Sequence, residues 1–258
     1  MTHDINTIAR MEWREIVCQP GALAGRGGYQ TDIATALLFA LMVGRGTVLT
    51  PIAFLVTGVL AVVLHRAPGS FAGERVNGTL EPVLATRIPC ESLYLGKALF
   101  HICYACCLGL ITLAVGAALV AIGMGPRATG GVTEAAQLVV DAAPFIALVG
   151  IPALALLTQL GVLVSMRSAT VAQAQQRAAL VLITILMAPV AIFFGLLVAL
   201  SRLRGRDWLL DLELLGEQLI AIDTHLWLLA SALILIALNA FALRTGLVWS
   251  KRSRLIIV

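Results

Sequence analysis

The chain has 258 residues, of which 60% are hydrophobic and 12% charged, against about 45–50% and 25% in a typical soluble domain. Its mean hydropathy of +0.96 excludes a soluble globular core and indicates a chain solvated mostly by lipid. The net charge of +4 does not point to nucleic acid as a partner, because the cationic residues lie in short loops, where they orient a membrane protein.

The first predicted element is an amphipathic helix at residues 5–18, within an N-terminal cytoplasmic segment at 1–30. Its apolar residues recur at 5, 8, 9, 13, 16 and 17, and its charges lie on the opposite face. This helix is too short and too charged to span a membrane. It is therefore expected to lie in the interface, with Trp13 at headgroup depth and Arg10 and Arg14 on the polar face. A solvated leader helix is the alternative.

Six membrane spans are predicted from apolar stretches of about 20 residues, at 31–44, 48–65, 93–122, 138–166, 176–200 and 225–247. The first two are separated by Gly44-Arg45-Gly46. An arginine at the centre of one long span would cost a few kcal/mol or more, so a tight hairpin with Arg45 at the far surface is preferred. Merging the two stretches would leave five spans and place the N-terminus outside.

The cationic residues are distributed unequally between the two sides of this arrangement. The more cationic side is expected to face the cytoplasm, which places both termini there and the protein in the inner (cytoplasmic) membrane of a cell. One side holds 13 of the 18 cations and the other holds five (Arg45, Arg127, Arg202, Arg204 and Arg206). The 13 are Arg10, Arg14, Arg26, Arg66, Arg75, Arg87, Lys97, Arg167, Arg177, Arg244, Lys251, Arg252 and Arg254.

A charged segment at 66–92, between the second and third predicted spans, is the most informative part of the chain. Glu74 and Arg75 charge its start, Thr79 is expected to cap a helix with its side-chain oxygen, and Pro82 falls in the first turn, where proline is tolerated. The apolar residues share one helical face: Val76, Leu80, Val83 and Leu84. Such a helix, parallel to the membrane, suits docking into a groove on a soluble partner. Coating of the lipid headgroups is the alternative.

Two other segments connect the later spans. Residues 165–176 are expected to form a short cytoplasmic turn. Residues 201–224 are expected outside, where acidic and apolar residues at 207–222 alternate at helical spacing and predict an amphipathic helix on the external leaflet. The expected fold is therefore an all-α integral membrane protein that forms a single transmembrane domain over residues 1–258.

Groups that could carry chemistry are few within the spans, and no catalytic residue, metal site or cofactor is predicted for this chain. One set allows a soft-metal or haem site, although packing of small residues is the favoured interpretation: His101, Cys103, Cys106 and Cys107. Three polar residues are candidates for lining a path or for interhelical hydrogen bonds: Thr158, Gln159 and Asn239. The only Gly-Lys, at 96–97, lacks the glycine-rich loop of an ATP site.

The pattern Glu74-Arg75, Gly78-Thr79-Leu80-Glu81, Leu84-Ala85-Thr86 and Gly96-Lys97 resembles the segment before the third span in permease subunits of type-2 ABC exporters. In that family the segment contains Glu-Arg, Gly-Thr-Leu-Glu, a Leu-x-Thr-Pro-like end and then Gly-Lys. The chain departs from it once, with Arg87 where the family commonly has proline, which affects the local turn rather than the docking role. Residues 165–176 are a second, weaker match.

The resemblance implies a permease that exports a substrate with energy from ATP hydrolysed by a partner. ATP and Mg²⁺ would be bound by two copies of a separate ABC-type ATPase, and the permease would form a homodimer or a heterodimer with a related permease. A path lined by the first, second and fifth spans and an amphipathic or lipid-like cargo are also implied. The residues implied in coupling to the ATPase are Glu74, Arg75, Gly78, Thr79, Leu80, Glu81, Leu84 and Thr86.

Other interpretations stay open from the sequence. Size and segment order are also similar to the haem-export permease of cytochrome c maturation. A membrane assembly or structural protein that transports nothing would tolerate loss of Glu74 and Glu81. A secondary transporter would need midplane charges or broken helices at matching places in two halves, and the sequence has neither.

Overall fold

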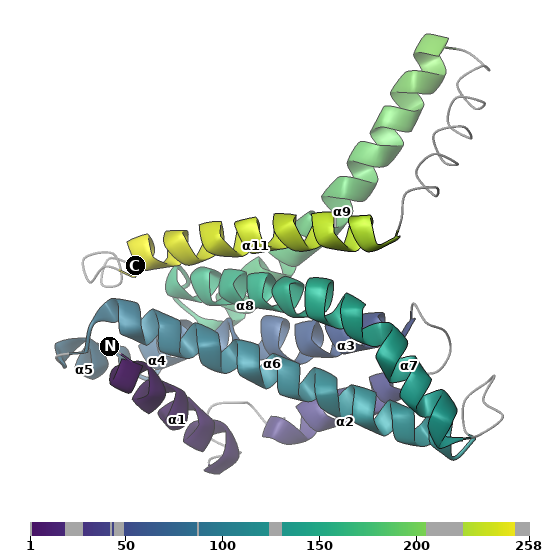
Figure 1. The fold of residues 1–258 in the computed structure, drawn as a ribbon. Helices are drawn as coiled ribbons and strands as arrows, with labels where there is room; N and C mark the ends of the chain where they lie inside the picture. The colour runs from purple at the N-terminus through teal and green to yellow at the C-terminus, as the bar shows by residue number, and fades with distance from the viewer. Residues whose placement is uncertain are drawn as a thin grey trace.

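The computed structural model describes residues 2–18, 28–41, 43, 49–86, 88–123, 131–204 and 224–250, and the regular elements in these ranges are all helices (Figure 1). The expected all-α fold is therefore confirmed for the described residues. The helices are α1 (Thr2–Cys18), α2 (Gly28–Ala40), α3 (Leu49–Gly58), η1 (Val59–Arg66), α4 (Gly69–Val76), α5 (Leu80–Ala85), α6 (Cys90–Ala121), α7 (Val132–Phe145), η2 (Ile146–Gly150), α8 (Ile151–Met166), α9 (Val171–Arg204) and α11 (Thr224–Trp249).

Four of the described helical runs are long and apolar enough to cross a membrane: Thr50–Val76, Cys90–Ala121, Val132–Met166 and Leu226–Trp249. They match the second, third, fourth and sixth predicted spans. The first predicted span coincides with α2, whose 13 residues give a rise of about 20 Å, short of the roughly 30 Å of a hydrocarbon core. The fifth lies within α9. The total of six spans stays a prediction.

Several sequence predictions fall outside the described residues. They include the turn at Arg45, the position of Arg87 and residues 205–223 of the external segment. Many of the cations that were counted for orientation also lie there, so the placement of the termini relative to a membrane is not tested by the fold.

The central helix is α6, which contacts α1, α2, α3, α7 and α8 (Figure 1). Its 32 residues are apolar almost all round, as is typical of a helix that is surrounded by other helices or by lipid. One core cluster lies where α1, α4, α5, α6 and α8 meet, and it includes Ile8, Phe71, Leu80, Tyr94 and Val162. A second lies between α3, η1, α6, η2 and α8, and it includes Phe54, Val62, Leu108, Ile146 and Leu154.

Much of α11 presents apolar side chains outward. Leu233 is 67% exposed and Phe241 71% exposed, although the helix also packs along α8. Soluble monomers rarely expose contiguous apolar surface on this scale. The surface of α11 is therefore suited to lipid or to another apolar helix.

The second candidate span does not end where the sequence suggested. The apolar stretch was expected to stop at residue 65, but the helical run continues through the π-helical stretch η1 and, after a turn at Ala67–Pro68, into α4 as far as Val76. The charged start of the 66–92 segment therefore belongs to the end of a helical run that is a candidate span. Figure 1 shows α4 and α5 at the end of the molecule that also carries both chain termini.

Candidate functional site

The segment from α4 to α5 forms a compact helix–turn–helix unit. Gly78 has φ of +69°, a left-handed conformation that glycine adopts without strain. It allows the Thr79 N–H to donate to the Glu74 carbonyl at 2.9 Å, so that orphan acceptors at the end of α4 are satisfied. Helix α5 begins directly after Thr79, and Pro82 falls in its first turn, as expected.

The expected cap by Thr79 is wrong in its atomic detail. Its backbone is helical rather than extended, and its side chain makes no capping bond to α5. The hydroxyl instead donates to the Glu74 carbonyl at 3.2 Å. The closed turn at Gly78 holds Thr79 against the end of α4, and this contact takes the place of a cap.

The apolar face of α5 points into the protein rather than toward a partner. Leu80 and Leu84 are buried in the core cluster formed with α1, α6 and α8. Glu81, Ala85 and Thr86 are exposed. The expectation that the apolar face docks into a partner's groove is therefore corrected: the face open to a partner carries Glu81, and the two leucines fix α5 to its own chain.

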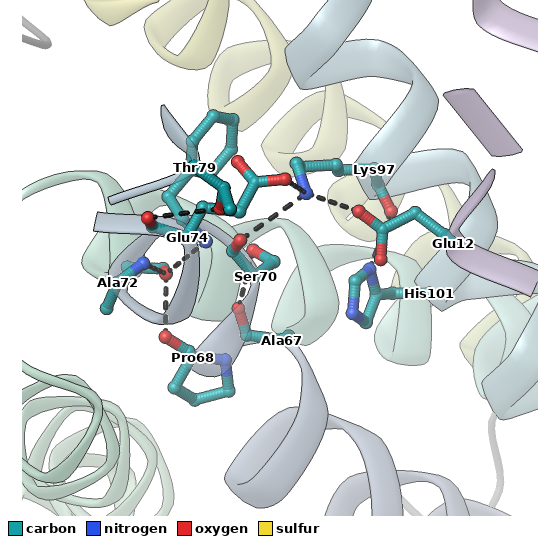
Figure 2. Close-up of polar contacts among 11 residues, drawn as sticks. Glu12, Ala67, Pro68, Ser70, Ala72, Glu74, Thr79, Lys97 and His101 are labelled. Atoms are coloured by element: carbon teal, nitrogen blue, oxygen red, sulfur yellow. Dashed lines mark hydrogen bonds and ion pairs between the residues drawn. The ribbon is translucent and has the colours of Figure 1, made fainter. Parts of the chain in front are cut away.

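Lys97 joins three helices through its ammonium group (Figure 2). The residue is 1% exposed, and its Nζ donates to Glu74 Oε1 at 2.8 Å and to Glu12 Oε1. It also lies 3.4 Å from the Ser70 carbonyl oxygen. Glu12 comes from α1, Glu74 from α4 and Lys97 from α6. A buried charge is tolerated when it is paired and hydrogen-bonded in this way.

His101 lies one turn after Lys97, beside Glu12 in Figure 2, and its Nδ1 is 2.7 Å from the Lys97 carbonyl oxygen. Glu12, Glu74, Lys97 and His101 are called the charge network below. Burial alone would raise the pKa of Glu12, but the charges of Lys97 and His101 and the hydrogen bond from Lys97 outweigh it and hold this pKa below its usual value. Glu12 is therefore a carboxylate at neutral pH.

The possible metal or haem set is not brought together in the fold. His101 is buried in the charge network, whereas Cys103 and Cys107 are exposed on α6. Among the described residues, no group of three or more histidine, cysteine or acidic side chains is placed to share a metal ion.

A second set of bonds ties α4 to the turn between α8 and α9. Arg75 donates to the Met166 carbonyl at 3.2 Å and to the Ser168 carbonyl. Ser165 Oγ accepts the N–H groups of Phe71 and Ala72, both at 3.0 Å. The same hydroxyl donates to the carbonyl of Pro68 at 2.6 Å. The two segments that carried the family resemblance, 71–97 and 165–176, are thus in direct contact.

The end of α11 reaches the same region. The guanidinium carbon of Arg167 lies 3.2 Å from the centre of the Trp249 ring, a cation–π contact. Arg177 of α9 donates to the Arg167 carbonyl at 2.9 Å. The α8–α9 turn is therefore held by α4, α9 and α11 together.

A buried ion pair fixes α2 beside the second candidate span. Asp32 Oδ2 accepts hydrogen bonds from Arg66 Nε at 3.0 Å and Nη2 at 2.8 Å, and from the Tyr104 hydroxyl at 2.9 Å. The sequence placed Asp32 and Arg66 near the ends of neighbouring predicted spans. That signal could have suggested the pair, but nothing local to either residue specifies it.

Helix α1 packs along the first half of α6 with one face inward. Ile8 is buried, and a side chain at Gly96 would place its Cβ 2.8 Å from Ile8 Cγ2, so glycine is what allows the close approach. Trp13 packs edge-on against Phe100, with ring centroids 6.4 Å apart. Arg10, Trp13 and Arg14 are exposed, as an interfacial helix requires.

The three polar candidates inside the spans lie on α8 and α11. Gln159 Nε2 donates to Asn239 Oδ1 at 3.2 Å, and Asn239 Nδ2 donates to the Pro152 carbonyl at 2.8 Å. Thr158 is fully buried, and its hydroxyl has no hydrogen-bond partner among the described residues. Of the two roles expected for these residues, Gln159 and Asn239 fill that of interhelical hydrogen bonding. A path-lining role stays a prediction.

The chain matches no protein-family model, no curated protein and no solved structure.

Sequence reasoning missed the pairing of Glu12 with Lys97 and the capping of α4 by Ser165. The sequence placed the charges of residues 5–18 on the face opposite the apolar residues, which is wrong for Glu12, because this side chain turns inward to Lys97.

Proposed function

We propose that the chain is the membrane permease subunit of a type-2 ABC exporter and moves its substrate with energy from ATP hydrolysed by a partner ATPase. The observation that carries the proposal is the contact between the two resembling segments. The two residues of the Glu74-Arg75 pair contact different segments. Glu74 binds Lys97 of the Gly-Lys pair, and Arg75 binds the turn that follows α8.

The bonds around α4 supply a route by which a force on α5 would reach the spans. Helix α5 is fixed to its own chain by Leu80 and Leu84 and exposes Glu81. Helix α4 continues the second candidate span. A push on α5 by the ATPase would therefore be passed to α1 and α6 through Lys97, and to α8 and α9 through Arg75 and Ser165.

The proposal includes the arrangement that the family implies. The α4–α5 end of the molecule would face the cytoplasm, with both termini there, six spans in the inner membrane and α1 in contact with membrane lipid. Two permease chains, identical or related, would bind two copies of the ATPase. The ATPase would carry ATP and Mg²⁺, and this chain would have no catalytic residue of its own.

Co-purification with the ATPase tests the proposal. The chain is expressed with its native genomic neighbours, purified in mild detergent and probed for an ATPase subunit. The test variant is Glu81→Lys with Ala85→Arg, because both side chains lie on the exposed face of α5. Leu84→Asp is avoided, since Leu84 is buried and its loss would report on folding. Glu91→Lys is the control, which makes the same acid-to-lysine change at another exposed acid nearby and leaves α5 unchanged.

We expect the ATPase to accompany the wild type and the control, and to be depleted at least about tenfold with the double variant, which corresponds to about 1.4 kcal/mol of binding free energy. An ATPase retained by the double variant would place the docking surface elsewhere. If no ATPase accompanies the wild type, the permease function is wrong and a membrane assembly role takes its place.

A further inference from the structure

Helix α1 carries an acid on its inner face and two arginines on its outer face. The packing of the inner face determines where the outer face points. Its inner face carries Ile8, which packs against Gly96, and Glu12, which pairs with Lys97. Residues two apart on a helix point in nearly opposite directions. Arg10 and Arg14, each two residues from Glu12, therefore point away from the protein, and both are exposed.

The outer face is cationic and apolar at once. Among the α1 side chains whose exposure is described, the exposed ones are Asn6, Thr7, Arg10, Met11, Trp13 and Arg14, with no acid among them. Met11 is 61% exposed and Trp13 51% exposed. An apolar side chain next to a tryptophan and two arginines is typical of helices that lie at the level of lipid headgroups.

We infer that the outer face of α1 is a binding surface for anionic phospholipid headgroups. Charge complementarity favours this occupant: two arginines four residues apart can share a lipid phosphate, while Glu12, which lies between them in the chain, is turned inward and paired with Lys97. Trp13 sets the depth, because its ring rests against Phe100 on α6 and leaves half its surface for the acyl boundary.

This inference relies on the membrane placement in the proposed function but not on the ATPase. Both arms of its test therefore use the full chain alone. Trp13 is made the only tryptophan by replacing Trp208, Trp227 and Trp249 with phenylalanine, and the protein is reconstituted in vesicles. Quenching of Trp13 fluorescence is then compared between dibrominated phosphatidylglycerol, which is anionic, and dibrominated phosphatidylcholine, which is zwitterionic.

We expect phosphatidylglycerol to quench Trp13 more strongly, with a preference of up to about 5-fold in binding constant for each arginine. The preference should fall toward unity in Arg10→Gln/Arg14→Gln and decrease with salt. Arg244→Gln, which removes an exposed arginine from α11, should leave it unchanged. Equal quenching by both lipids, or a preference that survives the double change, would refute the inference alone. No quenching by either lipid would refute the membrane placement as well.

Discussion

Replacing Lys97 by methionine should destabilise the protein more than any other single change in the charge network. Methionine keeps most of the length of the side chain but removes the ammonium group that donates to Glu12 and Glu74. The two carboxylates then face each other with neither a shared cation nor free access to water. An unpaired buried charge is among the most costly defects in a folded protein.

The magnitude follows from the burial of the three partners. Removing one member of a buried ion pair costs about 3–5 kcal/mol. Lys97 is 2% exposed at its side chain, Glu12 12% and Glu74 22%. Because water still reaches part of Glu74, the loss should lie near the lower end, about 3 kcal/mol. At about 2–4 °C per kcal/mol for a chain of this size, the melting temperature falls by about 6–12 °C.

Thermal unfolding in detergent, followed by circular dichroism, measures the effect. The matched control is the triple variant Lys97→Met/Glu12→Gln/Glu74→Gln, which keeps the shapes but removes all three charges. It should recover most of the lost stability, because a neutral network of similar volume has no unpaired charge to bury. A single variant that melts within about 2 °C of the wild type, or a triple variant no more stable than the single one, would contradict the reasoning.

Three further predictions concern the helices around the charge network, each measured by the same melting assay. Because folding lowers the pKa of Glu12 from 4.5, the contribution of this carboxylate to stability is complete above pH 4.5 and is lost as the pH falls through the pKa of the folded state. In acid, the melting temperature of the wild type should therefore approach that of Glu12→Gln. A constant difference in melting temperature between the two proteins from pH 7 to 3 would refute this. Gly96→Ala should lower the free energy of unfolding by about 1–3 kcal/mol, because the added methyl group pushes α1 away from α6. Adding Ile8→Ala to this variant should recover part of the loss, because Ile8 is the side chain that the methyl group meets. If nothing is recovered, the contact with Ile8 is not the cause of the loss. Ser165→Ala should cost at least about 1–3 kcal/mol, because it leaves two N–H groups of α4 and the Pro68 carbonyl without their partner; a neutral effect would mean that water replaces the hydroxyl.

The helical period correctly grouped Leu80 with Leu84, but it wrongly added Val76, which ends α4 and is 59% exposed, and it did not predict what covers the two leucines. Leu80 and Leu84 lie on one side of α5, as the spacing indicated, and yet they pack into the protein's own core instead of onto a partner. Amphipathicity says that a face will be buried. Whether the cover belongs to the same chain or to another depends on where neighbouring helices lie, and that is not encoded within six residues.

The ends of the predicted spans also separate what the sequence could predict from what it could not. At most ends, the third, fourth and sixth predicted spans agree to within a few residues with helical runs that are long and apolar enough to cross a membrane, because a lipid-facing helix must remain apolar along its length. The second predicted span ends at residue 65, because hydropathy falls at His65 and Arg66, whereas the helical run of the second candidate span continues to Val76. Asp32 and Ser165 stabilise that continuation, one by pairing with Arg66 and the other by binding the start of α4.

By itself, the sequence determined that the described chain is all helical and that long parts of it are suited to lipid. Composition and a local period are enough for that, because a backbone in lipid must satisfy its hydrogen bonds within the helix. Only the tertiary structure decided which charges meet. Glu12, Glu74 and Lys97 come from three different helices. Each is stable in the interior only because the packing of those helices brings its partners within hydrogen-bonding distance.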